Sequence, residues 1–277
     1  MKHLDGYIKD LKGNDIYYQC WLPDLDPEAI LLVIHGYAEH SGRYDKLADH
    51  FVSLNYGVYA LDHIGHGKSA GYRVYVHKFQ DFVDTLKIYC NMIINWHPNK
   101  PIYVIGHSMG GLISTALLID YQKKLAGAIL TSPCIKTFDE FTYMKIAVLE
   151  VLSTLLPKIK IAKIKAEFIS RDPKVVQAYN DDPLVNKGKI TARLASELRK
   201  TMNYIIEHAN KITIPILIMQ GRDDKIVDPV GSQILYDIIN SDDKTIKLYD
   251  HLFHEILNEP EHKRIMNNIK IWLDNQG

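Results

Sequence analysis

Short apolar runs that alternate with segments of helical periodicity limit this chain to few folds. The runs cover residues 16–21, 29–35, 57–62, 102–105, 126–131, 214–220 and 245–249. Between them, apolar side chains recur at three- and four-residue spacing in residues 44–54, 79–96, 110–121, 229–239 and 260–273. Apolar strands that alternate with amphipathic helices are typical of a mostly parallel sheet covered by helices on both faces. We therefore expect an α/β fold.

One interval, from residue 136 to residue 210, interrupts this alternation. It contains no convincing buried strand, and its helix-like stretches are punctuated by Pro157, Pro173 and Pro183. We expect residues 136–210 to form a helical cap (lid) inserted into a core made of residues 1–135 and 211–277.

Aliphatic residues and lysines are interleaved within the expected cap. A basic amphipathic surface can lie on a lipid interface, which would give the protein a peripheral membrane contact through the cap. The pattern fits equally well a cap helix whose apolar face covers the core while its lysines stay in water. The positions concerned are Ile146, Leu149, Leu152, Leu155, Leu156, Ile159 and Ile164 for the aliphatic residues and Lys145, Lys158, Lys160, Lys163 and Lys165 for the lysines.

Length and charge restrict the class of protein. A chain of 277 residues, 47% of them hydrophobic, can bury a substantial core in one main domain without disulfides. Lys and Arg number 33, as do Asp and Glu, so no field of the whole molecule would attract nucleic acid. We expect no nucleic-acid partner and no obligate protein partner, and any membrane contact must be local.

The cysteines and the N-terminus indicate a cytoplasmic protein. Cys20, Cys90 and Cys134 are widely spaced and odd in number, which argues for packing residues in a reducing compartment. The N-terminal residues lack the apolar stretch of a secretory signal, and no later run reaches the length of a membrane span.

A G-x-S-x-G box at residues 106–110 centres on Ser108. It follows the apolar run 102–105 and opens the helical segment 110–121, so strand, box and helix come in the order that a nucleophilic serine requires. The flanking glycines remove the Cβ atoms that would collide in so sharp a turn. The same string also occurs as an ordinary strand-to-helix connection, but its context predicts that Ser108 is a nucleophile.

A serine hydroxyl needs a base to accept its proton and an acid to orient that base. Asp223 and Asp224 follow the apolar run 214–220, and we expect Asp224 to be the acid and Asp223 to be a loop residue. His254 follows the run 245–249 and is the expected base, with His251 as its competitor. The order Ser, Asp, His, with the histidine close to the C-terminus, matches that of α/β-hydrolases.

The negative oxygen of a tetrahedral intermediate requires two preorganised donors. The Met109 amide follows the nucleophile and lies at a helix N-terminus, so we expect it to be one donor. The Tyr37 amide is the expected second donor, because Gly36 allows the backbone to turn at the exit of the run 29–35. His35 and Gly36 also fit a simple turn that ends a strand.

Other motifs give no support for a cofactor or a metal. Residues 65–69 end like a phosphate-binding loop, but Asp62 replaces the required first glycine, and no dinucleotide fingerprint opens a helix. The histidine pairs at 63 and 66 and at 251 and 254 lie outside a His-Glu-x-x-His helix and beside no cysteine cluster. We expect no cofactor and no metal.

Three strings carry a family resemblance. Residues 35–44 read His-Gly-Tyr-Ala-Glu-His-Ser-Gly-Arg-Tyr, residues 62–69 read Asp-His-Ile-Gly-His-Gly-Lys-Ser, and residues 106–111 read Gly-His-Ser-Met-Gly-Gly. With residues 170–173 and 181–185, they resemble the monoacylglycerol lipase and lysophospholipase branch of the α/β-hydrolases. The resemblance implies hydrolysis of a long-chain acyl ester of glycerol through an acyl-serine intermediate, with a small lipid ester as the substrate and a cap over the site.

The resemblance also assigns residues. It implies that Ser108, Asp224 and His254 form a triad and that Tyr37 and Met109 donate to the oxyanion. By the same likeness Glu39 and Arg43 lie near the glycerol end, although they equally fit a salt bridge that fixes the strand exit. The same scaffold serves lysophospholipases, carboxylesterases and some aminopeptidases, and a non-catalytic binder of apolar ligands is the alternative of another class.

Overall fold

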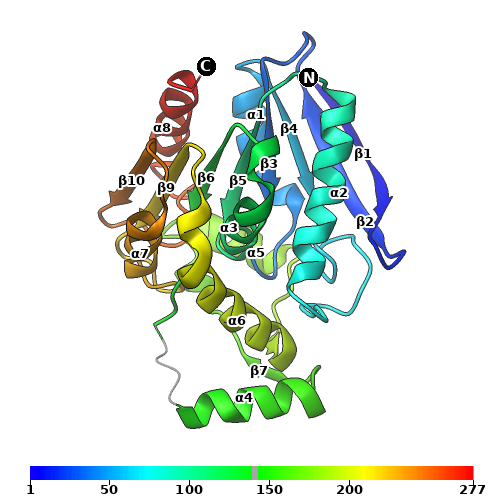
Figure 1. Cartoon of the computed structure of the whole chain (residues 1–277), viewed down its shortest axis with the longest axis vertical. Coiled ribbons are helices and arrows are strands. Elements are labelled where there is room, and N and C mark those ends of the chain that lie inside the picture. The colour runs from blue at the N-terminus through cyan, green and yellow to red at the C-terminus, as the bar shows by residue number, and fades with distance from the viewer. Residues whose placement is uncertain (139–142, 277) are drawn as a thin grey trace.

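A central sheet dominates the computed structural model, which describes residues 1–138 and 143–276. Within these residues, eight strands form one sheet in the order β1-β2-β4-β3-β5-β6-β9-β10 (Figure 1). β1 and β2 are antiparallel to their neighbours, and the other six strands of this sheet, β4, β3, β5, β6, β9 and β10, run parallel to one another. The expected mostly parallel sheet is therefore confirmed. The strands are β1 (Lys2–Lys9), β2 (Asp15–Leu22), β3 (Ala29–Ile34), β4 (Tyr56–Leu61), β5 (Ile102–His107), β6 (Gly127–Thr131), β9 (Ile216–Gly221) and β10 (Lys244–Tyr249).

Helices cover both faces of this sheet (Figure 1). On one face, α1 (Asp45–Val52) and α8 (His262–Asp274) bury their apolar sides in one hydrophobic cluster. On the other face, α2 (Gln80–Trp96), α3 (Met109–Tyr121) and α7 (Val230–Ile238) contribute to a second, larger cluster. Because β3 to β6 and β9 are buried along their whole lengths, they form a rigid base for the loops at their C-terminal ends.

The segment between β6 and β9 contains most of the expected cap. Its elements are α4 (Tyr143–Leu155), β7 (Lys160–Ala162), α5 (Pro173–Asp181), β8 (Ile190–Thr191) and α6 (Ala192–His208). Residues 139–142 of the predicted cap lie outside the described residues. α4 forms the lower end of the molecule in Figure 1, away from the sheet. The limits 136 and 210 for the cap stay a prediction.

The sequence prediction lacks one strand of the central sheet and a separate two-stranded sheet. The periodicity gives no sign of β1, because this edge strand is exposed along most of its length and carries no apolar alternation. The short antiparallel pair of β7 and β8 was also missed, since strands of two or three residues leave almost no pattern.

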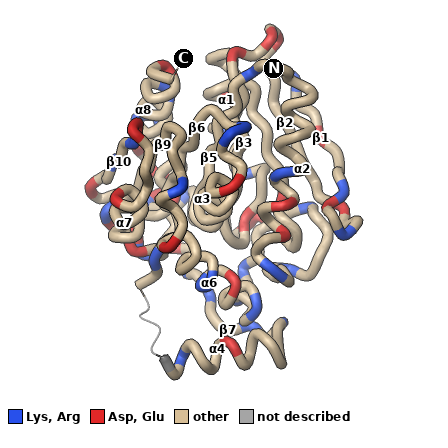
Figure 2. Tube along the Cα trace, viewed as in Figure 1, with Lys and Arg blue, Asp and Glu red and all other residues tan. Residues whose placement is uncertain are grey.

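Charged side chains of both signs are interspersed over the molecule, as Figure 2 shows along the backbone. This distribution agrees with the balanced composition, in which Lys and Arg equal Asp and Glu in number. None of the helices within the described residues combines the length and the hydrophobicity needed to span a bilayer.

Candidate active site

Ser108 occupies a strained turn between β5 and α3. Its backbone angles, φ 54° and ψ −117°, lie where few residues other than glycine are found. The turn requires glycine at position 110, because a Cβ there would lie 1.9 Å from the Ile34 carbonyl oxygen and 2.6 Å from that of His35. This close contact brings the N-terminus of α3 against the end of β3 and holds the Ser108 side chain above the sheet.

The predicted serine, histidine and aspartate form one hydrogen-bonded chain. His254 Nε2 lies 2.8 Å from the Ser108 hydroxyl, and His254 Nδ1 lies 2.7 Å from Asp224 Oδ2. Ser108 follows β5, Asp224 follows β9 and His254 follows β10, so three connections at the same edge of the sheet supply them. All three residues are buried. In this arrangement the imidazole can accept the hydroxyl proton while the carboxylate fixes the ring.

The two competing residues lie apart from this chain. His251 has a side chain that is 83% exposed, and its ring nitrogen lies 3.5 Å from the half-exposed Asp223 carboxylate. Asp223 and His251 therefore pair with each other in solvent, while Asp224 and His254 pair in the interior.

Four donors surround the Asp224 carboxylate. Oδ1 accepts from the amides of Ile226 and Val227 at 2.8 and 3.1 Å, and Oδ2 accepts from His254 and from the Gln220 side chain, the latter at 3.0 Å. Sequence reasoning missed Gln220. Its place as the penultimate residue of the strand that leads to the acid is the only signal that could have suggested it.

The surroundings of His254 stabilise the protonated form of its imidazole. Burial lowers the pKa of His254, but the Asp224 carboxylate opposes it by charge and by hydrogen bonding, so the pKa lies above its ordinary value. The Ser132 hydroxyl donates to the His254 carbonyl at 2.7 Å and fixes the backbone of this residue. Ser132 also has a positive φ, 47°, and was not predicted.

Of the two expected oxyanion donors, Met109 follows Ser108 in the chain and Tyr37 lines the same pocket as Ser108. Met109 is the first residue of α3, a position whose amide has no acceptor within its own helix. Tyr37 follows the exit of β3, and among the described residues no group accepts from its amide. Both residues border the nucleophile as predicted, and their role as donors stays a prediction.

A small pocket, with an accessible volume of about 20 Å³, opens at Ser108. Its apolar side includes Ile164, Ile169 and Tyr179 from the expected cap and Ile226 from the core. Its polar side contains carboxylates next to the nucleophile. The residues that line it are Gly36, Tyr37, Glu39, His107, Ser108, Ile164, Ile169, Tyr179, Ile226, His254 and Glu255.

Glu39 and Arg43 form a buried ion pair at the exit of β3. Arg43 Nη1 lies 2.7 Å from Glu39 Oε2, while Glu39 Oε1 accepts from the Gly36 amide at 2.6 Å and from the Tyr44 hydroxyl at 2.8 Å. Burial raises the pKa of Glu39, but the charges of Arg43, His107 and His35 and the Gly36 amide together outweigh it and lower the pKa to about 2. The geometry is that of a salt bridge that orders the loop. A contact of either residue with glycerol stays a prediction.

Comparisons with known proteins extend over nearly the whole chain. The family described as serine aminopeptidase, S33, matches residues 26–261. A monoacylglycerol lipase of Mycolicibacterium smegmatis is 38% identical over 261 residues, covering 94% of this chain and 93% of that protein. The monoglyceride lipase of Homo sapiens is 31% identical over 270 residues, covering 96% and 89%. The crystal structure of a Paleococcus ferrophilus monoacylglycerol lipase matches with a TM-score of 0.85 at 28% identity, covering 95% of this chain and 99% of that chain.

Proposed function

This chain belongs to the serine aminopeptidase S33 family of α/β-hydrolases, in its monoacylglycerol lipase branch, and from that membership we propose that it is a serine hydrolase that releases fatty acid and glycerol from monoacylglycerols. One observation carries the mechanism: the Ser108 hydroxyl, the His254 imidazole and the Asp224 carboxylate form a continuous hydrogen-bonded chain at a strained strand-to-helix turn.

The first half of the reaction acylates the serine. Ser108 Oγ forms a bond to the ester carbonyl carbon while its proton moves to His254 Nε2. The amides of Tyr37 and Met109 stabilise the oxyanion that results. The bond from carbon to the glycerol oxygen then breaks, and His254 returns the proton to that oxygen, so glycerol leaves and the acyl group stays on Ser108.

The second half restores the enzyme. The oxygen of a water molecule bonds to the acyl carbon while the water proton moves to His254 Nε2, which gives a second tetrahedral intermediate. The bond from the acyl carbon to Ser108 Oγ then breaks. The proton returns to Ser108 and the fatty acid leaves. The Asp224 carboxylate, held by four hydrogen bonds, orients the ring and stabilises the imidazolium in both halves of the reaction.

The pocket supports a substrate with an apolar and a polar end. The acyl chain would lie along Ile164, Ile169 and Ile226, and the glycerol hydroxyls would face Glu39, which also lines the pocket, and Arg43, which pairs with Glu39. Comparing kcat/KM for a monoacylglycerol and for the methyl ester of the same acid tests the polar end. A Glu39→Gln variant that keeps the wild-type preference between the two esters would exclude a glycerol contact of Glu39.

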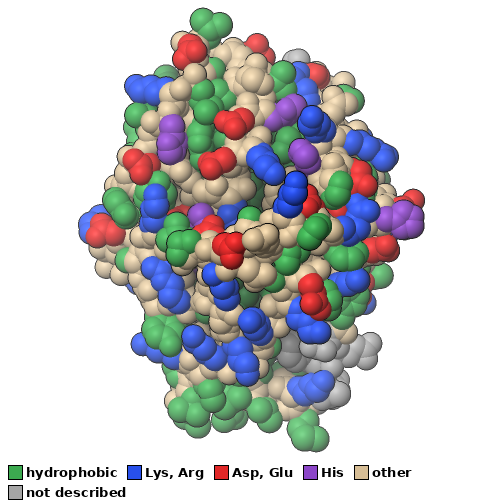
Figure 3. Space-filling model, turned by 180° about the vertical axis from the view of Figure 1, so that it is seen from behind, with side chains coloured by type: hydrophobic (Ala, Val, Ile, Leu, Met, Phe, Trp, Pro, Cys, Tyr) green, Lys and Arg blue, Asp and Glu red, His purple; other side chains and the backbone are tan. Residues whose placement is uncertain are grey.

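A peripheral membrane contact through the cap is supported by apolar side chains that project into solvent. Met144, Val151 and Leu155 of α4 are 77%, 55% and 73% exposed. Apolar side chains gather at the lower end of the molecule in Figure 3, below several lysines and arginines. Such a surface suits an anionic lipid interface. Unchanged sedimentation of a Val151→Asp, Leu155→Asp variant with phosphatidylglycerol vesicles would contradict the contact.

The compartment is also part of this proposal. Cys20, Cys90 and Cys134 are free and buried, which suits a protein that works in a reducing, cytoplasmic environment and meets the lipid from that side. Cell fractionation that finds the active enzyme outside the cytoplasm and its bounding membrane would contradict this placement.

The proposed reaction is tested by one substitution and a set of substrates. Ser108→Ala should abolish turnover of a long-chain monoacylglycerol and labelling by a fluorophosphonate, while circular dichroism stays at the wild-type spectrum. The wild-type enzyme should prefer that substrate to a lysophospholipid, nitrophenyl acetate and an aminoacyl amide. Normal hydrolysis by Ser108→Ala would contradict the proposed mechanism. A preference for the lysophospholipid, nitrophenyl acetate or the amide would contradict the proposed substrate class.

A further inference from the structure

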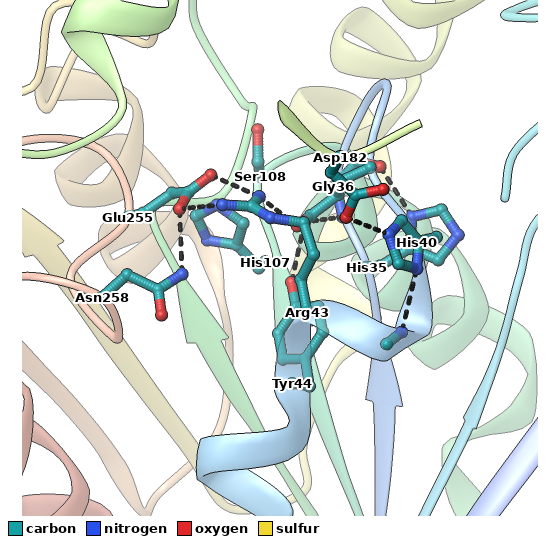
Figure 4. Close-up of polar contacts among 12 residues, drawn as sticks. His35, Gly36, His40, Arg43, Tyr44, His107, Ser108, Asp182, Glu255 and Asn258 are labelled. Atoms are coloured by element: carbon teal, nitrogen blue, oxygen red, sulfur yellow. Dashed lines mark hydrogen bonds and ion pairs between the residues drawn. The ribbon is translucent and has the colours of Figure 1, made fainter. Parts of the chain in front are cut away.

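A buried arginine joins the two loops that meet at Ser108. Arg43 belongs to the oxyanion loop (residues 36–44), and Glu255 belongs to the histidine loop (residues 250–261), next to His254. Arg43 Nη1 and Nη2 donate to Glu255 Oε1 and Oε2 at 2.7 and 2.8 Å, a two-point ion pair that Figure 4 shows beside the nucleophile. The arginine and glutamate side chains are only 11% and 6% exposed.

The same arginine reaches the oxyanion site at its other end. Arg43 Nη1 also donates to Glu39, which in turn accepts from the Gly36 amide. Gly36 lies close to both Glu39 and Ser108. A Cβ on Gly36 would be 2.9 Å from Glu39 Oε1 and 3.2 Å from the Ser108 Cβ. Gly36 immediately precedes Tyr37. A continuous chain of bonds therefore runs from Glu255 to the residue before the expected oxyanion donor.

Both carboxylate oxygens of Glu255 accept hydrogen bonds from the protein. Besides Arg43, its Oε2 accepts from the Asn258 side chain at 2.9 Å, and its backbone amide donates to the Ile169 carbonyl of the expected cap at 2.7 Å. Although Glu255 lines the pocket, both of its carboxylate oxygens are already paired. This pairing favours a role in holding other groups over direct contact with substrate.

From these contacts we propose that Glu255 is a positioning residue: through Arg43 and Glu39 it fixes the oxyanion loop relative to His254 and therefore relative to the Ser108 hydroxyl. This inference rests on the proposed function, because it assigns a role only if Ser108 is the nucleophile. A misplacement of about 1 Å between reacting groups can lower the rate about 100-fold, so a link between these loops matters for turnover.

The energetics agree with a geometric role. A buried ion pair gains little net stability over an apolar pair of the same size, because desolvation offsets the attraction of the charges. A two-point contact between guanidinium and carboxylate does, however, fix distance and orientation. The negative charge has a second effect, since Glu255 and Glu39 add to Asp224 in raising the pKa of His254.

The charged groups around His254 allow the two effects to be separated. Asp224, Glu255 and Glu39 face it with negative charge. Burial and the neighbouring His254 lower the pKa of His107 to about 4, so His107 is neutral near pH 7. Glu255→Gln removes charge and one acceptor, whereas Glu255→Asp keeps the charge and shortens the side chain by one methylene.

The test measures kcat, KM and pH dependence for a short, water-soluble ester, with active serines counted by fluorophosphonate. Both Glu255→Gln and Glu255→Asp should lower kcat per active serine about 10- to 100-fold, with KM changed less than about threefold. The acid limb of kcat/KM should move to lower pH in Glu255→Gln, because protonated His254 loses a stabilising charge, and should stay near wild type in Glu255→Asp. Because Glu255 and Arg43 act through the same link, the double variant Glu255→Gln, Arg43→Lys should lower kcat little more than the more damaging single variant does.

A matched control is Glu197→Gln, which removes a partly buried carboxylate that pairs with Arg193 on α6. No residue of α6 is among the described residues that line the pocket, so kcat and the acid limb should equal those of the wild type. A Glu255→Gln enzyme with wild-type kcat per active serine and an unmoved acid limb would overturn the positioning role and leave the proposed reaction intact. If Glu255→Gln does not fold, the double variant Glu255→Asp, Arg43→Lys is measured instead. Losses of kcat that simply add up in this double variant would overturn the positioning role. The proposed reaction has its own test: turnover by the Ser108→Ala variant would contradict it whatever the Glu255 variants show.

Discussion

At the scale of single residues, two neighbouring aspartates differ completely in their surroundings. The Asp224 side chain is fully buried and bonded to His254, whereas the Asp223 side chain is half exposed and faces His251. The sequence could place both on one loop above the sheet. Only the turn after β9 decides which of them points inward, because its amides at 226 and 227 close on the Asp224 carboxylate.

We predict opposite results for the two aspartates. Asp224→Asn should lower kcat about 10,000-fold, because an amide would donate to His254 Nδ1 and favour the wrong tautomer of the ring. Asp223→Asn should leave kcat unchanged, since its carboxylate makes no contact with the triad. Steady-state kinetics on one soluble ester measures both, and equal losses in the two variants would contradict the assignment.

The pH dependence of the wild-type enzyme is a second prediction. The free enzyme needs a neutral His254 to accept the serine proton, so kcat/KM should fall as the pH drops through the pKa of this group. That pKa is raised by the Asp224 carboxylate, and the midpoint should therefore lie above the ordinary histidine value of about 6.5.

Two buried histidines near the site, His107 and His66, cannot produce this limb. Burial lowers the pKa of His107 to about 4 and that of His66 to about 3, so both stay neutral across the range concerned. A profile of kcat/KM between pH 5 and 9 measures the midpoint. A value below that of free histidine would mean that Asp224 does not stabilise the imidazolium.

At the scale of elements, the sequence predicts best what is buried on both faces. The runs at 29–35, 102–105 and 214–220 correspond to β3, β5 and β9 within a few residues, because a strand that is apolar on both sides has an unambiguous pattern. β1 lies at the exposed edge of the sheet and carries no such signal.

The candidate site divides along the same line. Ser108, Asp224 and His254 were predicted because each follows a recognisable strand in the order that the mechanism requires. Ser132 and Glu255 were not, because their partners are found only after folding: Ser132 and His254 are 122 positions apart, and Arg43 and Glu255 are 212 positions apart. Gln220 lies only 4 positions from Asp224, but a glutamine within a strand does not mark itself as a partner of the acid. Their side chains carry no local motif.

The contact between α3 and β3 gives a third prediction. In Gly110→Ala the added Cβ would lie 1.9 Å from the Ile34 carbonyl oxygen, so α3 must move away from the sheet. We expect a loss of about 3 kcal/mol in the free energy of unfolding. The kcat should fall as well, because Ser108 and Met109 move with the helix. Urea unfolding and kinetics measure the two effects, and a variant with wild-type stability would contradict this packing.

At the scale of the whole molecule, the described part of the segment predicted as a cap is attached unevenly. α6 buries Leu194, Leu198 and Ile205 in the same cluster as α2 and α3, so it packs as part of the core. α4 contacts α6 but leaves Met144 and Leu155 largely exposed. If this segment moves as the predicted cap, the movement should therefore involve α4 much more than α6.

This difference leads to a fourth prediction, on hydrogen exchange. Amides exchange through local opening, and the free energy of opening rises with the apolar surface that the opening exposes. Peptides from α6 should therefore exchange about as slowly as those from the buried strand β5, while peptides from α4 should exchange at least about tenfold faster. Mass spectrometry of the whole protein in deuterated buffer gives both rates. Equal protection of α4 and α6 would mean that the segment opens as one unit and that the burial of α6 does not anchor it to the sheet.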